Sequence, residues 1–451
     1  MTIKSFKGGI HPPTRKEASV GKPLAYFMEP KQVVVPMNQH FGAPNQSLVK
    51  VGDTVKKGQR IADAEGRMTL PVHAPIAGTV KKIEPRAQSN NLDGPCIIIE
   101  NDGSGATDFM PPLDAFACTR EEALARIRDA GIGGMGGAGF PVYVKLAPPP
   151  NKPIDTVIAN GAECEPYLTI DEQTMHEMPE KVVEGLAIVM KVVGVKKGVI
   201  AMEEDTVNLV PVFEKAIAAA GHGLDITVQV LREKYPQGGE KMIITAVTGR
   251  QVPSGGLPMD VGCIVQNVGS LKAIADAFLE GKPLIDRGFT LSGGACSTPG
   301  NIIVPIGTLI SDLPPELLAY DAEKLRKILF GGPMMGVAVP RMDIPVQKNT
   351  SGVLLMTAKE AVAHQEGPCI RCGRCIKACS CLLTPVLMNA ALQAGELEES
   401  ERCGLMDCVE CGACSFACPS RIHLVQRFRV GKQLLRNKKA AMAKPPAGVK
   451  A

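Results

Sequence analysis

Two runs of four cysteines near the C-terminus limit this chain to few possible folds. The first run holds Cys369, Cys372, Cys375 and Cys379, and the second holds Cys408, Cys411, Cys414 and Cys418. In each run two residues separate the first three cysteines, so a tight turn can place three thiolates round one iron cubane while backbone N–H groups face its sulfides. The repeated spacing predicts two [4Fe–4S] clusters, and therefore an electron-transfer protein.

The fourth cysteine of each run lies about one helical turn further along. In two-cluster ferredoxins this last cysteine ligates the other cluster. We therefore expect Cys379 to join the first three cysteines of the second run, and Cys418 to join those of the first run. Ser380 follows Cys379 where the ferredoxin pattern has proline, but that proline ligates nothing, so two clusters are still expected.

Zinc and disulfides are the alternatives to iron. A tetrahedral zinc site uses two CxxC pairs, which leaves the third and fourth cysteines of each run without a role. Fifteen cysteines in a chain with no export signal indicate a reducing compartment, where thiols ligate metal and do not pair. We therefore expect a cytoplasmic protein. Cys381 and Cys403 lie beside the runs and could substitute as ligands, but we interpret both as bystanders.

Length and composition add a few limits. At 451 residues the chain should form about three domains with cores of their own. Its 47 glycines and 36 prolines favour many turns, and its net charge of +4 does not indicate nucleic-acid binding. No apolar segment follows Met1, and the longest apolar stretch, residues 182–195, is broken by Glu184 and Lys191. It is too short to cross a bilayer, so we expect a protein that is soluble or peripheral on a membrane.

Residues 31–110 are expected to form short strands separated by turns. The predicted strands cover residues 32–35, 47–51, 60–62, 79–83 and 96–100. Segments 51–59 and 74–80 resemble the biotinyl/lipoyl carrier fold, a small β barrel sandwich. Arg67 stands where a carrier has its modified lysine, and a guanidinium cannot be acylated as an amine can. We therefore interpret this domain as structural.

Apolar strands alternate with helices further along the chain. A helix is expected over residues 120–130, with acidic residues in its first turn and Gly131 as its cap. Strands are then predicted at residues 156–159, 198–202 and 226–230, and helices at residues 178–193 and 207–220. This order predicts a doubly wound α/β domain. Residues 288–344 return to strands and turns, which predicts a small β-rich module.

A basic segment closes the chain. Its cations are Arg427, Arg429, Lys432, Arg436, Lys438, Lys439 and Lys444. A solvated helix face is the simplest interpretation, and docking on an anionic membrane or an acidic partner is the alternative.

A glycine-dense loop over residues 131–141 follows the first predicted helix. Glycines permit positive φ and bring backbone N–H groups close to a phosphate or a flat ring. Glycine content alone leaves a flavin or nucleotide site and a flexible hinge equally open. The strand at residues 156–159 leads into Asn160-Gly-Ala-Glu-Cys-Glu-Pro-Tyr167, at the edge where open α/β sheets bind ligands. Residues 235–240 and 265–270 form two further polar turns.

These segments together resemble a known family. Residues 131–145 are similar to the GxxGxGGAGFPxxxK loop of the NADH-oxidising flavoprotein subunit of respiratory complex I. The stretch from Asn160 resembles that subunit's NADEGEP, the turn from Tyr235 its YxxGEE, and residues 266–268 its NNV. With the carrier-like front and the double ferredoxin run, nearly the whole chain resembles the RnfC family, the NADH-oxidising subunits of the Rnf membrane complexes.

The resemblance implies roles for particular residues. Those implied to hold FMN and approach NADH are Gly134, Gly136, Gly137, Gly139, Lys145, Asn160, Glu163, Tyr235 and Asn267. Glu165 and Glu240 would face the nicotinamide or its ribose, and with Lys145 they are the implied catalytic residues. Ala162 and Gly239 replace acidic residues of the family pattern, so some hydrogen bonds should differ. The alternative for Lys145 and Glu165 is a solvated surface pair.

The resemblance also implies a mechanism. A flavin accepts hydride as two electrons and releases them singly to iron–sulfur clusters. Electrons would pass from NADH through FMN and both clusters to other subunits of a membrane complex at the cytoplasmic face, with ferredoxin as the ultimate acceptor or donor. One alternative is a soluble flavin and iron–sulfur reductase, such as a cobalamin reductase or the electron-transfer protein of proline reductase. The other is a non-catalytic ferredoxin-like relay.

These patterns predict an α/β multidomain chain in four parts. Residues 1–117 would form an N-terminal region with a barrel-sandwich-like β domain, and residues 118–270 a doubly wound α/β domain for FMN and NADH. Residues 271–350 would form the small β-rich module, similar to a β-grasp, and residues 351–451 an α-helical two-cluster ferredoxin-like domain with the basic tail.

Overall fold

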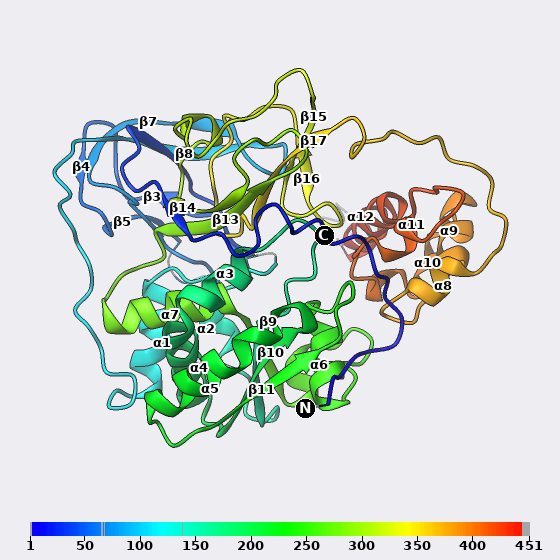
Figure 1. The fold of residues 1–451 in the computed structure, drawn as a ribbon, viewed down its shortest axis with the longest axis horizontal. Coiled ribbons are helices and arrows are strands. Elements are labelled where there is room, and N and C mark those ends of the chain that lie inside the picture. Colours follow the sequence, from blue (N-terminus) through cyan, green and yellow to red (C-terminus); the bar gives the residue numbers. More distant parts are fainter. Residues whose placement is uncertain (1, 65, 67, 138, 444–451) are drawn as a thin grey trace, which may run out of the picture.

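Four sheets, the helices that cover one of them, and a separate group of helices at the C-terminal end make up the described part of the molecule. The computed structural model describes residues 2–64, 66, 68–137 and 139–443. The helical group, coloured orange to red, lies to one side of the sheets in Figure 1. The mixture of sheets and helices confirms the predicted α/β multidomain fold, while the boundaries at residues 117, 270 and 350 stay predictions.

The N-terminal β domain consists of two small antiparallel sheets with a shared core. Hydrogen bonds join its strands in the order β2-β8-β7-β4 in one sheet and β3-β5-β6 in the other. The strands are β2 (Gln32–Pro36), β3 (Gln46–Ser47), β4 (Thr54–Val55), β5 (Arg60–Asp63), β6 (Val72–His73), β7 (Gly78–Ala87) and β8 (Asp93–Asn101). Val33, Ile61 and Ile97 are fully buried in the core that both sheets share. This arrangement confirms the barrel-sandwich prediction.

One predicted strand of this domain is too long. The structure ends β3 at Ser47, whereas the sequence pattern extended it to Val51. Local bonds take the backbone N–H groups that a partner strand would need. Val49 donates to the Ser47 hydroxyl at 3.3 Å, and Lys50 donates to the Asp53 carboxylate at 2.9 Å. Arg67, at the place of the carrier lysine, lies outside the described residues.

A parallel sheet of order β11-β10-β9-β12 forms the central domain. Its strands are β9 (Thr156–Gly161), β10 (Lys197–Glu203), β11 (Asp225–Leu231) and β12 (Cys263–Asn267). Helices α1 (Arg120–Asp129), α4 (Pro179–Val193), α5 (Val210–Ala220) and α7 (Val268–Leu279) cover one face, and α6 (Glu240–Thr248) covers the other. The shorter helices are α2 (Val142–Lys145) and α3 (Ile170–Glu177). Helices on both faces confirm the doubly wound prediction.

Capping residues explain where two of these helices begin. Thr119 caps α1 by accepting from the Glu122 N–H at 3.2 Å, and the Glu122 carboxylate accepts from the Thr119 N–H at 2.8 Å. Asn267 caps α7 by accepting from the Gly269 N–H at 2.9 Å. Residues 265–270, expected as a polar turn, are therefore the end of β12 and the start of α7. The strand was not predicted because Gln266 is polar, although the structure buries it.

A six-stranded sheet of order β1-β14-β13-β17-β15-β16 follows. Its strands are β1 (Ala25–Tyr26), β13 (Asp286–Ser292), β14 (Gly300–Pro305), β15 (Leu325–Phe330), β16 (Val337–Val339) and β17 (Gly352–Thr357). The predicted β-rich module supplies four of them. β1 comes from the N-terminal region, and β17 comes from beyond residue 350 and joins β13 to β15. The module is therefore completed by segments from both sides of it in the sequence.

The cysteine runs lie in the helical group. Its helices are α8 (Arg374–Ala378), α9 (Pro385–Gln393), α10 (Leu397–Arg402), α11 (Ala413–Phe416) and α12 (Leu424–Ala443). They pack round Met388, Leu405 and Phe428, which are fully buried. Within the part of the chain that the structure describes, we find no helix whose length and apolar character would let it span a bilayer.

The first residues of the chain run between the central domain and the helical group, as the blue segment in Figure 1 shows. Ile10 exchanges two backbone hydrogen bonds with Tyr235 of the central domain, each 2.9 Å long. Gly9 donates its N–H to the carbonyl of Ala378 in α8 at 3.1 Å. This N-terminal segment therefore contacts both bodies at once.

Candidate functional site

A large cavity opens where strands β9 and β12 end. It holds about 1350 Å³ of empty space, counted out to its open mouth, which is ample for a mononucleotide. Asn160 and Asn267 line it from the two strand ends, and Gly136 and Gly137 line it from the glycine loop. The carboxyl ends of a parallel sheet are where open α/β folds bind ligands.

Most of the predicted site residues meet in this cavity. They are Gly136, Gly137, Asn160, Glu163, Glu165, Tyr235 and Asn267. Gly134 and Gly139 instead shape the loop, since the Gly134 N–H donates to the Phe140 carbonyl at 2.9 Å and Gly139 has a φ of 67°. Lys145 forms an ion pair with Glu240, the first residue of α6. The catalytic roles of Lys145 and Glu240 stay predictions.

Asn160 holds two of the predicted segments together. Its side-chain amide donates to the Gly238 carbonyl at 2.8 Å, and its amide oxygen accepts from the Ala162 N–H at 3.1 Å. A side chain at Gly238 would collide with the Ala162 carbonyl oxygen. The end of β9 and the turn at residues 235–240 are therefore in direct contact at the cavity wall.

Glu163 is a buried carboxyl group of this wall. It accepts from the N–H groups of Asp171 and Glu172, at 3.0 and 3.1 Å, near the start of α3. Burial raises the pKa of Glu163 to about 8, the nearby Asp171 carboxylate adds to the rise, and Lys16 opposes it. Asp171 accepts from the Asn267 amide at 2.6 Å. This part of the wall therefore carries both carboxyl and amide groups at the cavity.

Glu165 faces the same cavity and is fixed by backbone donors. Its two oxygens accept from the N–H groups of Met334 and Met335 at 3.0 and 2.9 Å. Burial raises the pKa of Glu165 to about 7, although both N–H groups oppose the rise. Lys145 and Glu165 therefore do not pair with each other. Lys145 pairs with Glu240, and Glu165 accepts from the backbone of residues 334 and 335. Glu165 is a group that titrates near neutral pH at the ligand cavity.

The sequence motifs missed part of the cavity wall. Asp171, Arg287 and residues 349–351 also line it, but they belong to none of the motifs. Arg287 is buried, its Nε donates to the Thr350 carbonyl at 2.6 Å, and its Nη1 reaches the sulfur of Met135 at 2.8 Å. The only signal was a basic residue at the start of a predicted β module, which is too common to mark a site.

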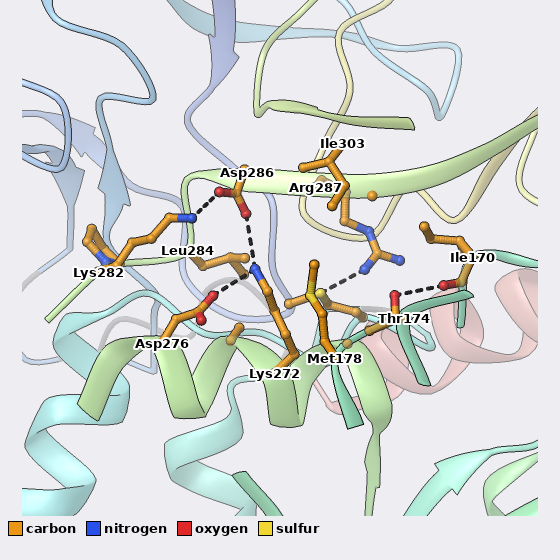
Figure 2. A pocket seen from close by; sticks show the side chains of 15 residues that line it. Ile170, Thr174, Met178, Lys272, Asp276, Lys282, Leu284, Asp286, Arg287 and Ile303 are labelled. Carbon is orange, nitrogen blue, oxygen red and sulfur yellow. Dashed lines mark hydrogen bonds and ion pairs between the residues drawn. The ribbon is translucent and has the colours of Figure 1, made fainter. Parts of the chain in front are cut away.

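A second, smaller cavity shares Arg287 with the first, and Figure 2 shows the charges round it. Lys272 of α7 pairs with Asp276 at 2.7 Å and with Asp286 at 3.7 Å, and Lys282 also pairs with Asp286. Burial lowers the pKa of Lys272, but the two aspartates raise it by more. These charges compensate one another, so we interpret the network as structural.

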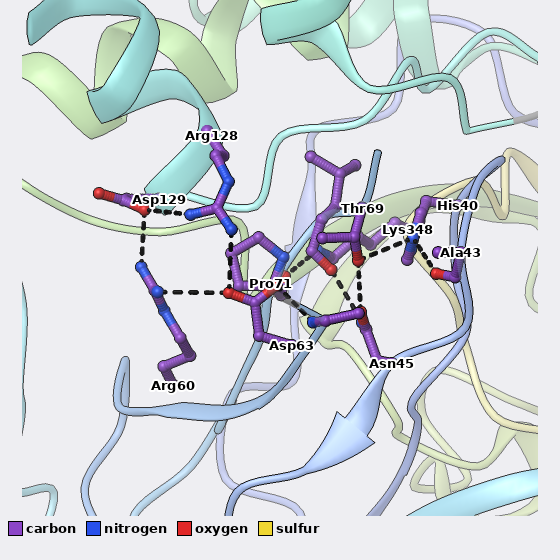
Figure 3. Close-up of polar contacts among 12 residues, drawn as sticks. His40, Ala43, Asn45, Arg60, Asp63, Thr69, Pro71, Arg128, Asp129 and Lys348 are labelled. Carbon is purple, nitrogen blue, oxygen red and sulfur yellow. Dashed lines mark hydrogen bonds and ion pairs between the residues drawn. The ribbon is translucent and has the colours of Figure 1, made fainter. Parts of the chain in front are cut away.

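Lys348 connects three parts of the molecule (Figure 3). Its ammonium donates to the Pro71 carbonyl of the N-terminal β domain at 2.9 Å and to the Gly131 carbonyl of the glycine loop at 2.7 Å. Residues 349–351, which follow it, line the large cavity. Burial lowers the pKa of Lys348 to about 7, and Asp63 opposes this shift. Lys348 therefore fixes the position of the glycine loop from outside the cavity.

The substitution Lys348→Met is expected to change how stability depends on pH. The lysine has its ordinary pKa in the unfolded chain and a pKa of about 7 in the folded one, so the unfolded state binds more protons between these values. The free energy of unfolding of the wild type should therefore rise from pH 7 to pH 9, relative to that of the variant, by up to about 2 kcal/mol. Urea denaturation at both pH values measures the difference. Lys327→Met, at an exposed lysine, should keep the wild-type slope, and equal slopes in all three proteins would contradict this account.

Cysteines of both runs meet in one cavity of the helical group. Cys379 lines it together with Cys408, Cys411 and Cys414 of the second run. It holds about 340 Å³ of empty space, counted out to its mouth. The bystander Cys381 lines it too. We call Cys379, Cys408, Cys411 and Cys414 the inner cysteines. Their arrangement agrees with the interleaved pattern expected from the spacing, and their role as ligands stays a prediction.

The other four cysteines lie nearer the surface. Cys369 and Cys372 are exposed, and Cys375 and Cys418 are half-buried. Burial raises the pKa of the Cys375 thiol, and the neighbouring sulfurs of Cys418 and Cys372 add a small rise. Cys418 of the second run thus lies beside members of the first run. We call these four the outer cysteines.

Tyr235 lies between the large cavity and the inner cysteines. It is 1% exposed and lines the large cavity, and its hydroxyl donates to the Cys411 carbonyl at 2.6 Å. Its ring packs with Ala378 and Ala413, which belong to the first and second cysteine runs. One buried side chain therefore joins the wall of the large cavity to the inner cysteines.

Comparison with known families agrees with this geometry. The Nuo51 FMN-binding domain matches residues 127–276, which hold the glycine loop and both asparagines, and the RnfC barrel sandwich hybrid domain matches residues 4–104. With the cavity at the strand ends, these matches define a protein with a Nuo51-type FMN-binding domain behind an RnfC-type barrel sandwich domain.

Named relatives resolve the family further. A protein of Clostridium ljungdahlii, one of the subunits of its proton-translocating ferredoxin:NAD(+) oxidoreductase complex, is 43% identical over 410 residues, which cover 90% of this chain and 88% of that protein. The corresponding protein of the Na(+)-translocating complex of Acetobacterium woodii is 42% identical over 437 residues, 96% and 98% of the two chains. The chain belongs to the RnfC family, as its motifs predicted. A solved NAD+-reducing [NiFe]-hydrogenase aligns over 76% of this chain and 71% of its own, with a TM-score of 0.49 and 17% identity.

Proposed function

We propose that this chain is the NADH-oxidising electron-input subunit of a membrane-bound, ion-translocating NADH:ferredoxin oxidoreductase. It would pass electrons from NADH through FMN and two [4Fe–4S] clusters to membrane partner subunits, and it would lie on the cytoplasmic face of the membrane. The names of its relatives, ferredoxin:NAD(+) oxidoreductase complexes that translocate protons or Na+, support this activity. The observation that carries the proposal is the buried Tyr235, which contacts both the large cavity and the inner cysteines.

The residues of the large cavity fit a flavin. A side chain at Gly136 would press on Asn267 at 3.3 Å, whereas one at Gly137 would extend into open space. The loop therefore leaves room for a flat ring beside Gly137. Asn160, Glu163 and Asn267 supply amide and carboxyl groups round that room. When bound there, FMN would supply the conversion of a two-electron hydride donor to one-electron acceptors.

The same contacts suggest an order for the two clusters. Tyr235 touches the backbone of an inner cysteine, while two of the outer cysteines are exposed. The cluster of the inner cysteines would therefore receive electrons from the flavin, and the cluster of the outer cysteines would exchange them with a partner. Cys381 has no ligand role in this proposal.

Anaerobic reduction by NADH tests the proposal directly. Protein purified without air should hold FMN and about eight irons per chain. NADH should bleach the flavin band and then the iron–sulfur absorption. Zinc in place of iron would remove the electron path, and a flavin that stays oxidised in NADH would leave only a ferredoxin-like relay.

Replacing Glu165 by glutamine should slow flavin reduction by NADH about tenfold and remove its dependence on pH near neutrality. Because its folded-state pKa is about 7, the Glu165 carboxyl is neutral below that pH and anionic above it. Only the anion stabilises the positive charge that the nicotinamide gains as it loses hydride. The wild-type rate, measured by stopped-flow bleaching, should therefore increase from pH 6 to pH 8.

The control for this experiment is Glu214→Gln, at an exposed position of α5. It removes the same charge far from the wall residues and should keep the wild-type pH profile. A wild-type rate that does not change between these pH values would exclude Glu165 from this role.

A further inference from the structure

The outer cysteines lie on an open face of the helical group. Cys369 and Cys372 are exposed, whereas Cys414 of the inner cysteines is buried. Two apolar side chains beside them also face solvent: Ile370 is 66% exposed and Ile376 is 39% exposed. A cluster held by these cysteines would therefore lie within reach of another protein.

Unpaired positive charge surrounds this face. Arg371, Arg374 and Lys377 are exposed, and no aspartate or glutamate occurs in residues 367–395. The N–H of Gly367 donates to the carbonyl of Ser420 at 2.8 Å. This bond brings the exposed Arg421, the next residue, to the same part of the surface. None of these four cations forms an ion pair within the described part of the chain.

Most other cations of the helical group are neutralised. Those with a carboxylate partner are Arg402, Arg427, Arg429, Lys432, Lys438 and Lys439. Arg436 is the one cation of residues 367–443, apart from the four named above, for which the structure gives no ion pair. The basic segment at the end of the sequence is thus largely compensated, and the free charge gathers round the exposed cysteines.

We propose that this outer face, defined as residues 369–377 with Arg421, docks an acidic electron-transfer protein. The inference rests on the proposed function, in which the outer cysteines hold the cluster that exchanges electrons with a partner. Transient electron-transfer complexes use small interfaces, and complementary charge steers the encounter and fixes its orientation. A partner with carboxylates round its own redox centre would meet the four cations and cover Ile370 and Ile376.

A membrane surface fits this face less well than a protein does. Lipid packed on Cys369 and Cys372 would close the route from the outer cluster. The long helix α12, which could lie on a bilayer, has most of its cations tied to carboxylates. The four cations also lower the energy of a negatively charged cluster, but exposed charges do this weakly because water and salt screen them.

Charge reversal on the full-length holoprotein tests the proposal. The variant R371E/R374E/K377E reverses the outer face, and K50E/K56E/K327E makes the same change in net charge at exposed lysines of other domains. The probe is a reduced acidic two-cluster ferredoxin, which donates one electron per cluster. With NAD+ as the acceptor, two electrons and one proton yield NADH, whose absorbance is followed at several salt concentrations.

At low salt kcat/KM for the ferredoxin should fall about tenfold or more in the outer-face variant and stay within about twofold in the control. At high salt, kcat/KM of the wild type should fall toward that of the outer-face variant, because salt screens the charges. Bleaching of the flavin by NADH should be equal in all three proteins. A ferredoxin rate that is unchanged in the outer-face variant, or that falls equally in both variants, would overturn the proposal.

Two further measurements separate the rival explanations. An EPR-monitored redox titration that finds a shifted cluster potential with unchanged kcat/KM would mean that the cations only tune the cluster. Cosedimentation of the wild type, but not of the outer-face variant, with phosphatidylserine vesicles would assign the face to a membrane. If NADH fails to reduce the wild-type flavin, the proposed function fails; binding of oxidised ferredoxin to the same variants, which needs no NADH, still decides whether the face docks an acidic protein.

Discussion

Replacing Cys379 by serine is expected to stop NADH from reducing either cluster, while the flavin still bleaches. Cys379 shares its cavity with Cys408, Cys411 and Cys414, so serine removes a thiolate from the cluster that we propose next to Tyr235. The iron content should fall from about eight to about four per chain. The outer cluster keeps its cysteines but loses the neighbour that supplies its electrons. Iron analysis and stopped-flow spectra under nitrogen measure both effects.

Two matched serine variants sharpen this result. Cys381 lines the same cavity but is interpreted as a bystander, so Cys381→Ser should keep both clusters and normal reduction. Cys369→Ser removes an exposed outer cysteine, and NADH should still reduce the inner cluster. Loss of a cluster in Cys381→Ser, or a block of the inner cluster in Cys369→Ser, would show that the two groups are assigned wrongly.

Replacing Gly238 by alanine is expected to weaken FMN binding. The added methyl group would collide with the carbonyl oxygen of Ala162, which is a backbone atom and cannot rotate aside. The turn must then move away from the end of β9, which breaks the 2.8 Å bond from Asn160 to the Gly238 carbonyl. Such overpacking costs about 1–3 kcal/mol, equivalent to about a fivefold to hundredfold loss of affinity. Quenching of FMN fluorescence by the flavin-free protein measures it.

The neighbouring Gly239 is the natural control. A methyl group there would meet the Pro236 carbonyl at 3.1 Å and the flexible Met242 side chain at 3.2 Å, both of which need only a small shift. Gly239→Ala should therefore bind FMN within about threefold of the wild type, because the added contact costs well under 1 kcal/mol. Equal losses in both variants would mean that the whole turn is sensitive, and not the contact with Ala162.

Much of the large cavity could be predicted from the sequence, because the motifs follow strands of one parallel sheet. Asn160 and Asn267 occupy the ends of β9 and β12, which pair directly. Their side chains must therefore lie at the same edge. Lys145 and Glu240 share the motifs but not the cavity wall. They lie on helices and pair with each other, and motif identity alone could not distinguish these positions.

The residues that sequence analysis missed depend on contacts between distant segments. Lys348 is 277 positions from Pro71 and 217 from Gly131, and no local periodicity marks a lysine as fully buried. The place of Arg287 in the cavity wall likewise depends on a distant contact, the packing of the six-stranded sheet on the glycine loop. Strand β17 of that sheet was not predicted, because it lies beyond the last segment for which strands were expected.

The N-terminal segment also bears on how the molecule is assembled during synthesis. Residues near Gly9 leave the ribosome long before their hydrogen-bond partner Ala378 is made. Such a contact closes a very long loop, and contacts of that kind form late in folding. The central domain can thus fold first, and the connection between its cavity and the cysteine helices is completed only after those helices have emerged.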